Sequence, residues 1–106
     1  MPKEPERDEL VITKVLYALS DDVRLSIARK LDEDGPCTCG VFEVDRPKSS
    51  LSHHLRVLRE SGIVSTTRHG TALLNTLRRK DLDARFPRLL DAILEQPSAR
   101  VARRKS

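Results

Sequence analysis

The sequence predicts a mainly α-helical domain with one small β-hairpin. Apolar residues recur at helical spacing over residues 8–19, 20–35 and 48–61, and after Gly62 the pattern changes to two short β-branched, apolar stretches. With 106 residues the chain has the size of one ordinary domain, so one hydrophobic core has to support every element. We expect a flexible tail over residues 1–7, a folded domain over 8–96 and a basic flexible tail over 97–106.

The first helix is predicted over residues 8–19, where apolar side chains recur every three or four positions. The stripe that should face the core consists of Ile12, Val15, Leu16 and Leu19. Further apolar side chains lie outside this stripe, namely Leu10, Val11 and Tyr17. One face of a short helix is enough for the core of a small chain, so this surplus favours burial against a partner.

A second helix is predicted from residue 20 to the pair Gly35-Pro36, which ends helices. Ser20 is the expected N-cap, and Asp21 and Asp22 follow in the first turn, where the helix dipole favours negative charge. The apolar residues of this helix are spaced by four: Val23, Ile27 and Leu31. A short third helix is expected around Cys39 to Val44.

The helix predicted from about Lys48 to Ser61 has two chemically different faces. At about 100° per residue, the stripe that faces the core consists of Leu51, Leu55 and Leu58. The opposite face consists of Ser49, His53, Arg56 and Glu60, with Ser52 on its flank. Short serines and hydrogen-bond donors suit close approach to a DNA major groove. His54 lies nearer the apolar side, which favours a satisfied boundary histidine over a ligand.

Two strands are predicted over residues 63–67 and 71–77, joined by a turn at Arg68-His69-Gly70. A hairpin that directly follows a DNA-contacting helix in the sequence is typical of the wing of a winged helix. Arg68 and His69 at its tip would lie near phosphates or a minor groove, unless the turn is simply exposed.

The last helix is predicted over residues 87–96, with Pro87 in its first turn and Pro97 behind it. Its wide apolar stripe consists of Phe86, Leu89, Leu90, Ile93 and Leu94. Apolar surface on both terminal helices is easier to bury in two copies of the chain than in one. The sequence therefore favours a homodimer.

Positive charge is concentrated in the middle of the chain. Residues 46–80 contain eight Lys and Arg against one acidic residue, Glu60, whereas residues 1–45 contain six basic and eleven acidic residues. Such an asymmetry is typical of a surface that meets a polyanion, although a solvated basic face is the alternative. The only aromatic residues of the Phe, Tyr and Trp type are Tyr17, Phe42 and Phe86, too few for a base-stacking platform. Duplex DNA is therefore favoured over RNA or single strands.

The strings SLSHHLRVLRESGIV and LYALSDDVRLSIARKL, with the basic turn RHG, resemble the ArsR/SmtB family of bacterial repressors over about residues 8–95. The resemblance implies a dimeric winged helix-turn-helix regulator that binds an inverted-repeat operator and is released by an effector. It places the DNA contacts on Lys48, Ser49, Ser50, Ser52, His53, Arg56 and Arg68. The first and last helices would form the dimer interface, through Leu10, Val11, Tyr17, Leu90 and Ile93.

Cys37 and Cys39 occupy a place similar to the Cys-X-Cys of metalloid-sensing family members. Two thiolates are good ligands for thiophilic ions, but Phe42 stands where a third cysteine often occurs, and the last helix lacks the family's alternative histidine site. Metal or metalloid sensing, thiol oxidation and no sensing by these cysteines remain open. No cofactor is expected to be required.

The sequence also bears on the class of protein and its location. A winged helix that binds an acidic protein partner is the alternative function, but the outward face of residues 48–61 lacks large apolar anchors. An enzyme is not expected, because no nucleophile with a base, glycine-rich phosphate loop or complete metal set is present. The charged start MPKEPERDEL and the absence of an apolar run near ~18 residues predict a cytoplasmic protein without a membrane partner.

Overall fold

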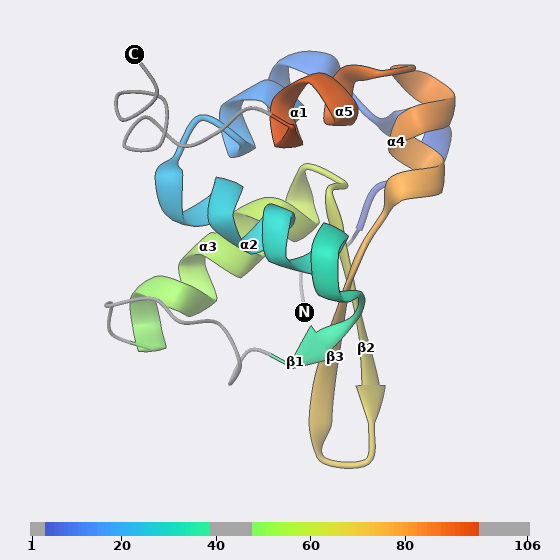
Figure 1. The fold of residues 1–106 in the computed structure, drawn as a ribbon. Helices are drawn as coiled ribbons and strands as arrows, with labels where there is room; N and C mark the ends of the chain where they lie inside the picture. Colours follow the sequence, from blue (N-terminus) through green and yellow to red (C-terminus); the bar gives the residue numbers. More distant parts are fainter. Residues whose placement is uncertain (1–3, 39–47, 96–106) are drawn as a thin grey trace.

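The computed structural model describes residues 4–38 and 48–95, and it places helices around one end of an antiparallel sheet (Figure 1). The elements are a 3₁₀ turn η1 (Arg7–Glu9), α1 (Ile12–Ala18), α2 (Asp22–Asp34), β1 (Cys37–Thr38), α3 (Lys48–Glu60), β2 (Val64–His69), β3 (Ala72–Leu77), α4 (Arg79–Arg85) and α5 (Leu89–Leu94). The predicted class, mainly helical with a β-hairpin, is confirmed. The short helix predicted around Cys39 to Val44 lies outside the described residues.

The start of α2 is capped by Asp21. Its side chain accepts hydrogen bonds from the backbone N–H of Val23 at 2.9 Å and of Arg24 at 3.0 Å. The prediction of Ser20 as the N-cap is wrong, because the Ser20 hydroxyl donates to the carbonyl of Tyr17 at the end of α1 instead. The predicted end of α2 is confirmed, since Gly35 follows Asp34 with a φ of 83°.

The sheet has the order β1-β3-β2, so the hairpin of β2 and β3 is extended by a short strand that the sequence analysis did not predict. In the hairpin, His69 pairs with Ala72, which leaves Gly70 and Thr71 as the loop. The turn therefore lies slightly later in the chain than predicted, because Gly70, with a φ of 65°, is its first residue and not its last. Arg68 consequently belongs to the end of β2.

The chain after the hairpin forms two short helices where one was predicted. Helix α4 was missed because Leu82 is its only buried residue, so it has no apolar periodicity to detect. Helix α5 begins at Leu89, after Arg88 adopts a positive φ of 70°. Arg79 ties α4 to α2 and α5 through ion pairs with Asp32 and Asp91, and it also pairs with Asp83 one turn along α4.

Part of the stretch that was expected to be an N-terminal tail contacts the sheet. The carboxylate of Glu4 accepts a hydrogen bond from the Ser65 hydroxyl at 2.8 Å and another from the Thr66 backbone N–H at 3.0 Å. Arg78 donates to the carbonyl of Pro5 at 2.6 Å. The Glu4 contacts lie at β2, one of the two edge strands of the sheet, where the backbone N–H of Thr66 would otherwise face solvent.

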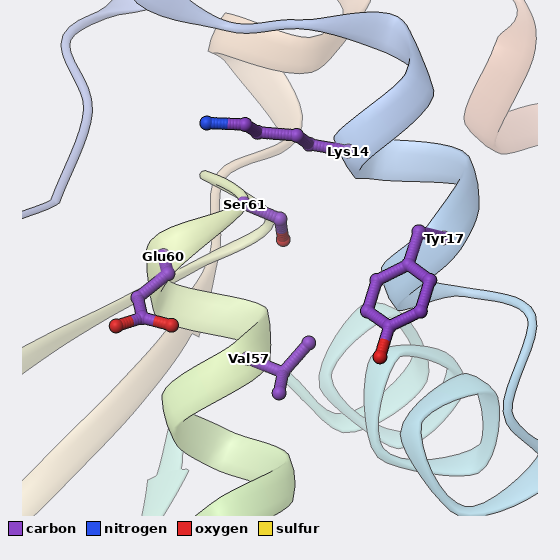
Figure 2. Close-up of a pocket in the computed structure, with 5 residues that line it drawn as sticks. All are labelled: Lys14, Tyr17, Val57, Glu60 and Ser61. Atoms are coloured by element: carbon purple, nitrogen blue, oxygen red, sulfur yellow. The ribbon is translucent and has the colours of Figure 1, made fainter.

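A groove of about 530 Å³ separates α1 from the C-terminal end of α3 (Figure 2). Its lining consists of Lys14, Tyr17, Val57, Glu60 and Ser61. Next to it, α1 and the residue before it expose four large apolar side chains: Val11, Ile12, Leu16 and Tyr17. This apolar face has no cover within the described part of the chain. The assignment of Ile12 and Leu16 to the stripe that faces the core is therefore wrong, whereas Val15 and Leu19 are buried as predicted.

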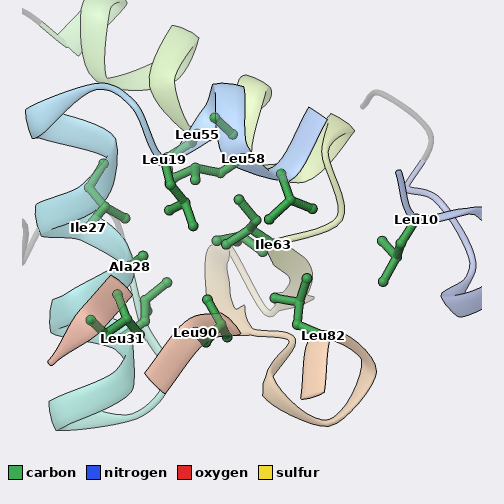
Figure 3. Packing of buried hydrophobic residues seen from close by; sticks show 14 residues of the cluster. Leu10, Leu19, Ile27, Ala28, Leu31, Leu55, Leu58, Ile63, Leu82 and Leu90 are labelled. Carbon is green, nitrogen blue, oxygen red and sulfur yellow. The ribbon is translucent and has the colours of Figure 1, made fainter. Parts of the chain in front are cut away.

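The core lies between α1, α2, α3 and the C-terminal helices (Figure 3). Leu10 and Leu90, which the sequence assigned to surplus apolar surface, belong to this core, because their exposed fractions are only 3% and 1%. The assignment of both to an unburied surface is therefore wrong. Leu10 packs beside Gly62, and α5 lies against α2, where Arg29 donates to the carbonyl of Leu94. Ile93 is half-buried against the same core, whereas Val11 and Tyr17 are exposed as expected.

Among the glycines of residues 4–38 and 48–95, Gly62 is predicted to be the least tolerant of a side chain. Its φ is +87°, and a Cβ there would lie 2.1 Å from Cδ2 of Leu10, so Gly62→Ala requires both backbone strain and a shift of Leu10. We expect a decrease of about 2–3 kcal/mol in the free energy of unfolding, measured by urea titration. The matched control is Gly70→Ala, because Gly70 has a φ of +65° but open space where the Cβ would lie. This substitution should lower the free energy of unfolding by about 1 kcal/mol. Equal decreases would contradict the steric argument.

Candidate DNA-binding surface

Helix α3 separates an apolar inner face from a polar outer face. Leu55 and Leu58 are 5% and 0% exposed, while Leu51 is half-buried against the core. The exposed side chains of the helix are Ser52, His53, Arg56 and Glu60, and Ser50 is half-buried. Lys48 and Ser49 lie in the first turn, although their side chains are outside the description. The two faces predicted from the periodicity are therefore observed wherever the side chains are described.

The hairpin of β2 and β3 extends beyond α2 and α3, on the side away from α1 and α5 (Figure 1). Arg68 and His69 near its tip are exposed. At its base, Arg59 of α3 approaches Thr66 at 3.5 Å, and Thr66 donates to the buried side-chain oxygen of Asn75 at 2.8 Å. Polar contacts thus join α3 to β2 through Arg59 and Thr66, and β2 to β3 through Thr66 and Asn75.

A buried arginine lies behind α3. Arg24 is 6% exposed, and its Nε donates to the carbonyl of Ala18 at 2.7 Å. Its Nη1 lies 3.1 Å from Nδ1 of His54, and its guanidinium carbon lies 5.4 Å from the centre of the Tyr17 ring. His54 is therefore a half-buried boundary histidine with a partner, as predicted. Sequence reasoning missed Arg24 because a charged residue between apolar positions of a helix normally points to solvent.

The positive charge of residues 46–80 is only partly available to a ligand. Arg78 forms an ion pair with Asp81, and Arg79 is engaged by carboxylates of α2, α4 and α5. Arg56 on α3 and Arg68 on the wing are exposed and form no ion pair with any described residue. The cationic side chains that remain accessible on the described surface therefore include Arg56 on the outer face of α3 and Arg68 on the wing.

Cys37 lies in strand β1, where it pairs with Asn75 of β3 while Thr38 pairs with Leu74. Burial raises the pKa of its thiol, despite the opposing charge of Lys30. Cys39 lies outside the described residues. Among residues 4–38 and 48–95, no three His, Cys, Asp or Glu side chains form a group suited to a metal ion. In the same ranges, no helix is both long and apolar enough to cross a membrane.

Comparison with known proteins places a helix-turn-helix domain family on residues 19–67, which span α2, α3 and most of β2. An uncharacterised HTH-type transcriptional regulator of Methanocaldococcus jannaschii is 37% identical over 60 residues, which are 55% of this chain and 67% of that protein. A homologue of the cadmium resistance transcriptional regulatory protein CadC of Staphylococcus aureus is 34% identical over 74 residues, covering 68% of this chain and 61% of that protein.

Solved structures agree with these sequence relatives. The transcriptional repressor BigR from Xylella fastidiosa superposes with a TM-score of 0.59 and is 34% identical, over 77% of this chain and 84% of that one. An ArsR-like transcriptional regulator from Rhodococcus has a TM-score of 0.62 over 89% of each chain, and at 22% identity it supports the fold alone.

Proposed function

Because the chain belongs to the ArsR/SmtB family of winged helix-turn-helix regulators, which bind DNA and are not enzymes, we propose that it is an operator-specific repressor. It acts in the cytoplasm as a homodimer on an inverted repeat, and an effector releases it. The observation that supports this proposal is the outer face of α3, where Ser52, His53 and Arg56 are exposed, together with a wing that exposes Arg68 near its tip.

In this proposal α3 enters the major groove. Ser49, Ser50 and Ser52 keep the backbone close to the bases, and His53 and Arg56 donate to base edges. Lys48 and Arg68 neutralise phosphates on either side of the groove. Two copies related by a two-fold axis would read half-sites whose centres lie about one helical turn, or a multiple of it, apart.

The base-reading and phosphate-binding roles predict different changes in affinity. Arg56→Ala and His53→Ala should each weaken binding to the selected operator by about 1–3 kcal/mol and relax sequence preference at one position of each half-site. Lys48→Ala and Arg68→Ala should weaken binding to all duplexes alike and reduce the salt slope by about 1 for each phosphate that is no longer neutralised. Duplex affinity is measured at several salt concentrations.

Glu60→Ala is the control for these variants, because Glu60 lies on the outer face at the far end of α3 and should be neutral or slightly favourable. If folded Arg56→Ala and His53→Ala proteins bind the operator as tightly as the unchanged chain, α3 is not the reading helix. Preference for an acidic protein over every duplex would instead favour the alternative, a winged helix that binds protein.

Dimerisation is proposed through α1. The exposed fractions of Val11, Ile12 and Leu16 are 44%, 43% and 45%, and that of Tyr17 is 65%, so adjoining side chains leave a continuous apolar face. An isologous pairing covers such a face with the same face of a second copy. Leu10 and Leu90 are buried in the core of each copy and are not part of this face, and Ile93 is partly buried against the same core.

Leu16→Glu should therefore dissociate the dimer and weaken operator binding at the same time, since one copy reaches only one half-site. Ala84→Glu is the control, because Ala84 is exposed on α4 and lies outside this apolar face. Sedimentation at micromolar concentration gives the mass, and operator titration gives the affinity. A 12.0 kDa particle for the unchanged chain would exclude the dimer.

Release by an effector is proposed to act through Cys37 and Cys39. The CadC homologue is named for cadmium resistance, and two thiolates close in sequence are ligands for thiophilic ions. Cys37 belongs to β1, which hydrogen-bonds to the wing strand β3, so a bond at its sulfur would act on the wing. Burial raises the pKa of the Cys37 thiol, so little thiolate is present at neutral pH and metal binding should strengthen as pH rises.

Cadmium or arsenite should therefore release the operator complex, and Cys37→Ser and Cys39→Ser should each abolish this response while leaving DNA affinity in its absence unchanged. Peroxide in a parallel titration separates thiol oxidation from metal binding. The cysteine hypothesis fails if none of the agents changes DNA binding, or if both variants respond like the unchanged chain.

A further inference from the structure

The buried guanidinium of Arg24 joins three elements behind the reading helix. It extends from α2, donates to the Ala18 carbonyl at the end of α1 at 2.7 Å, and lies 3.1 Å from Nδ1 of His54 on α3. The backbone N–H of Arg24 is itself bound by the N-cap Asp21. His53, the adjacent residue of α3, is exposed on the outer face that is proposed to contact bases.

The Arg24–His54 contact depends on the protonation state of the imidazole. An arginine is only a donor, so Nδ1 of His54 has to be the unprotonated acceptor, and the ring is neutral while the contact is made. A proton on Nδ1 removes the acceptor and places a second positive charge beside the guanidinium. Within the described structure, Oδ2 of Asp21 lies 3.8 Å from Nδ1, and this carboxylate offers a protonated His54 another partner.

The groups around His54 define how the contact can change. From α2 they are Arg24 and its N-cap Asp21, from α1 the Tyr17 ring that lies under the Arg24 guanidinium, and from α3 itself His53, whose ring centre is 5.7 Å away. Desolvation acts to raise the pKa of Asp21, but hydrogen bonds from the α2 backbone and the Arg24 charge lower it overall. Asp21 therefore remains an anion across the range in which histidines titrate.

We infer that Arg24 and neutral His54 are positioning residues that hold α3 at the angle to α2 required for reading the operator. When His54 is protonated, its partner changes from Arg24 to Asp21. This change of partner alters the angle at which α3 packs against α2. Sequence-specific binding then disappears at acid pH, whereas non-specific attraction to phosphates is kept. The inference rests on the proposed operator binding and adds a proton-sensitive contact that touches no DNA.

The test compares affinity for a selected operator with affinity for a scrambled duplex of the same length, at about pH 8 and about pH 5.5, on either side of the ordinary histidine pKa of about 6.5. His54→Leu removes the acceptor at similar volume and should lower the operator-to-scrambled ratio by about three- to tenfold at pH 8. His54→Asn places an amide oxygen near the position of Nδ1 and does not titrate. It should restore the ratio at pH 8 and keep it at pH 5.5, where the unchanged chain loses it.

His69→Asn is the matched control, because His69 is an exposed wing histidine whose replacement should leave the acid-induced fall of the ratio in place. The inference is overturned if folded His54→Leu keeps the ratio at pH 8, or if His54→Asn loses it at pH 5.5 like the unchanged chain. Absence of any operator preference in the unchanged chain at pH 8 would instead refute the proposed function.

Discussion

The burial of the Arg24 guanidinium is the constraint on which the helical part of the domain depends. A charge removed from water has to keep its hydrogen bonds, because an unpaired buried charge costs several kcal/mol. Arg24 meets this requirement with the carbonyl of Ala18 and the imidazole of His54, and the Tyr17 ring covers one face of its guanidinium. Ile27 of α2 and Leu58 of α3 belong to the same apolar core. Apolar contacts are non-directional, so in the proposed role the directional hydrogen bonds of Arg24 add the constraint on the angle between the two helices.

A second polar connection orients the wing. Asn75 is 1% exposed in the middle of β3, where it accepts from Thr66 of β2 and donates to the carbonyl of Cys37 in β1. One amide therefore joins all three strands, and the contact of Arg59 with Thr66 extends the connection to α3. Because a buried amide without partners is costly, the strands are fixed in register at the point where they meet the reading helix.

Features whose residues lie close together in the sequence, such as the two faces of α3, could be predicted from it. Features that depend on residues far apart in the sequence could not. The two faces of α3 and the stops at Gly35 and Gly62 follow from periodicity and from glycine's access to positive φ, so they were predicted. Strand β1 has two residues and exists only because β3 is there to pair with it. Periodicity also cannot tell whether an apolar residue is covered by its own chain or by a second copy, and for this reason Leu10 and Leu90 were assigned to an interface.

Charge pairing links the proposed dimer to the proposed DNA contacts. The formal excess of positive charge in residues 46–80 is reduced in the fold, because carboxylates engage Arg78 and Arg79. A surface that presents few free cations releases few counterions, so one copy alone would hold a half-site weakly. Linking two copies makes binding of the second half-site effectively intramolecular, which raises affinity without any further protein–DNA interaction. The exposed apolar face of α1, far from the wing, would then contribute to operator binding as much as the residues that touch DNA.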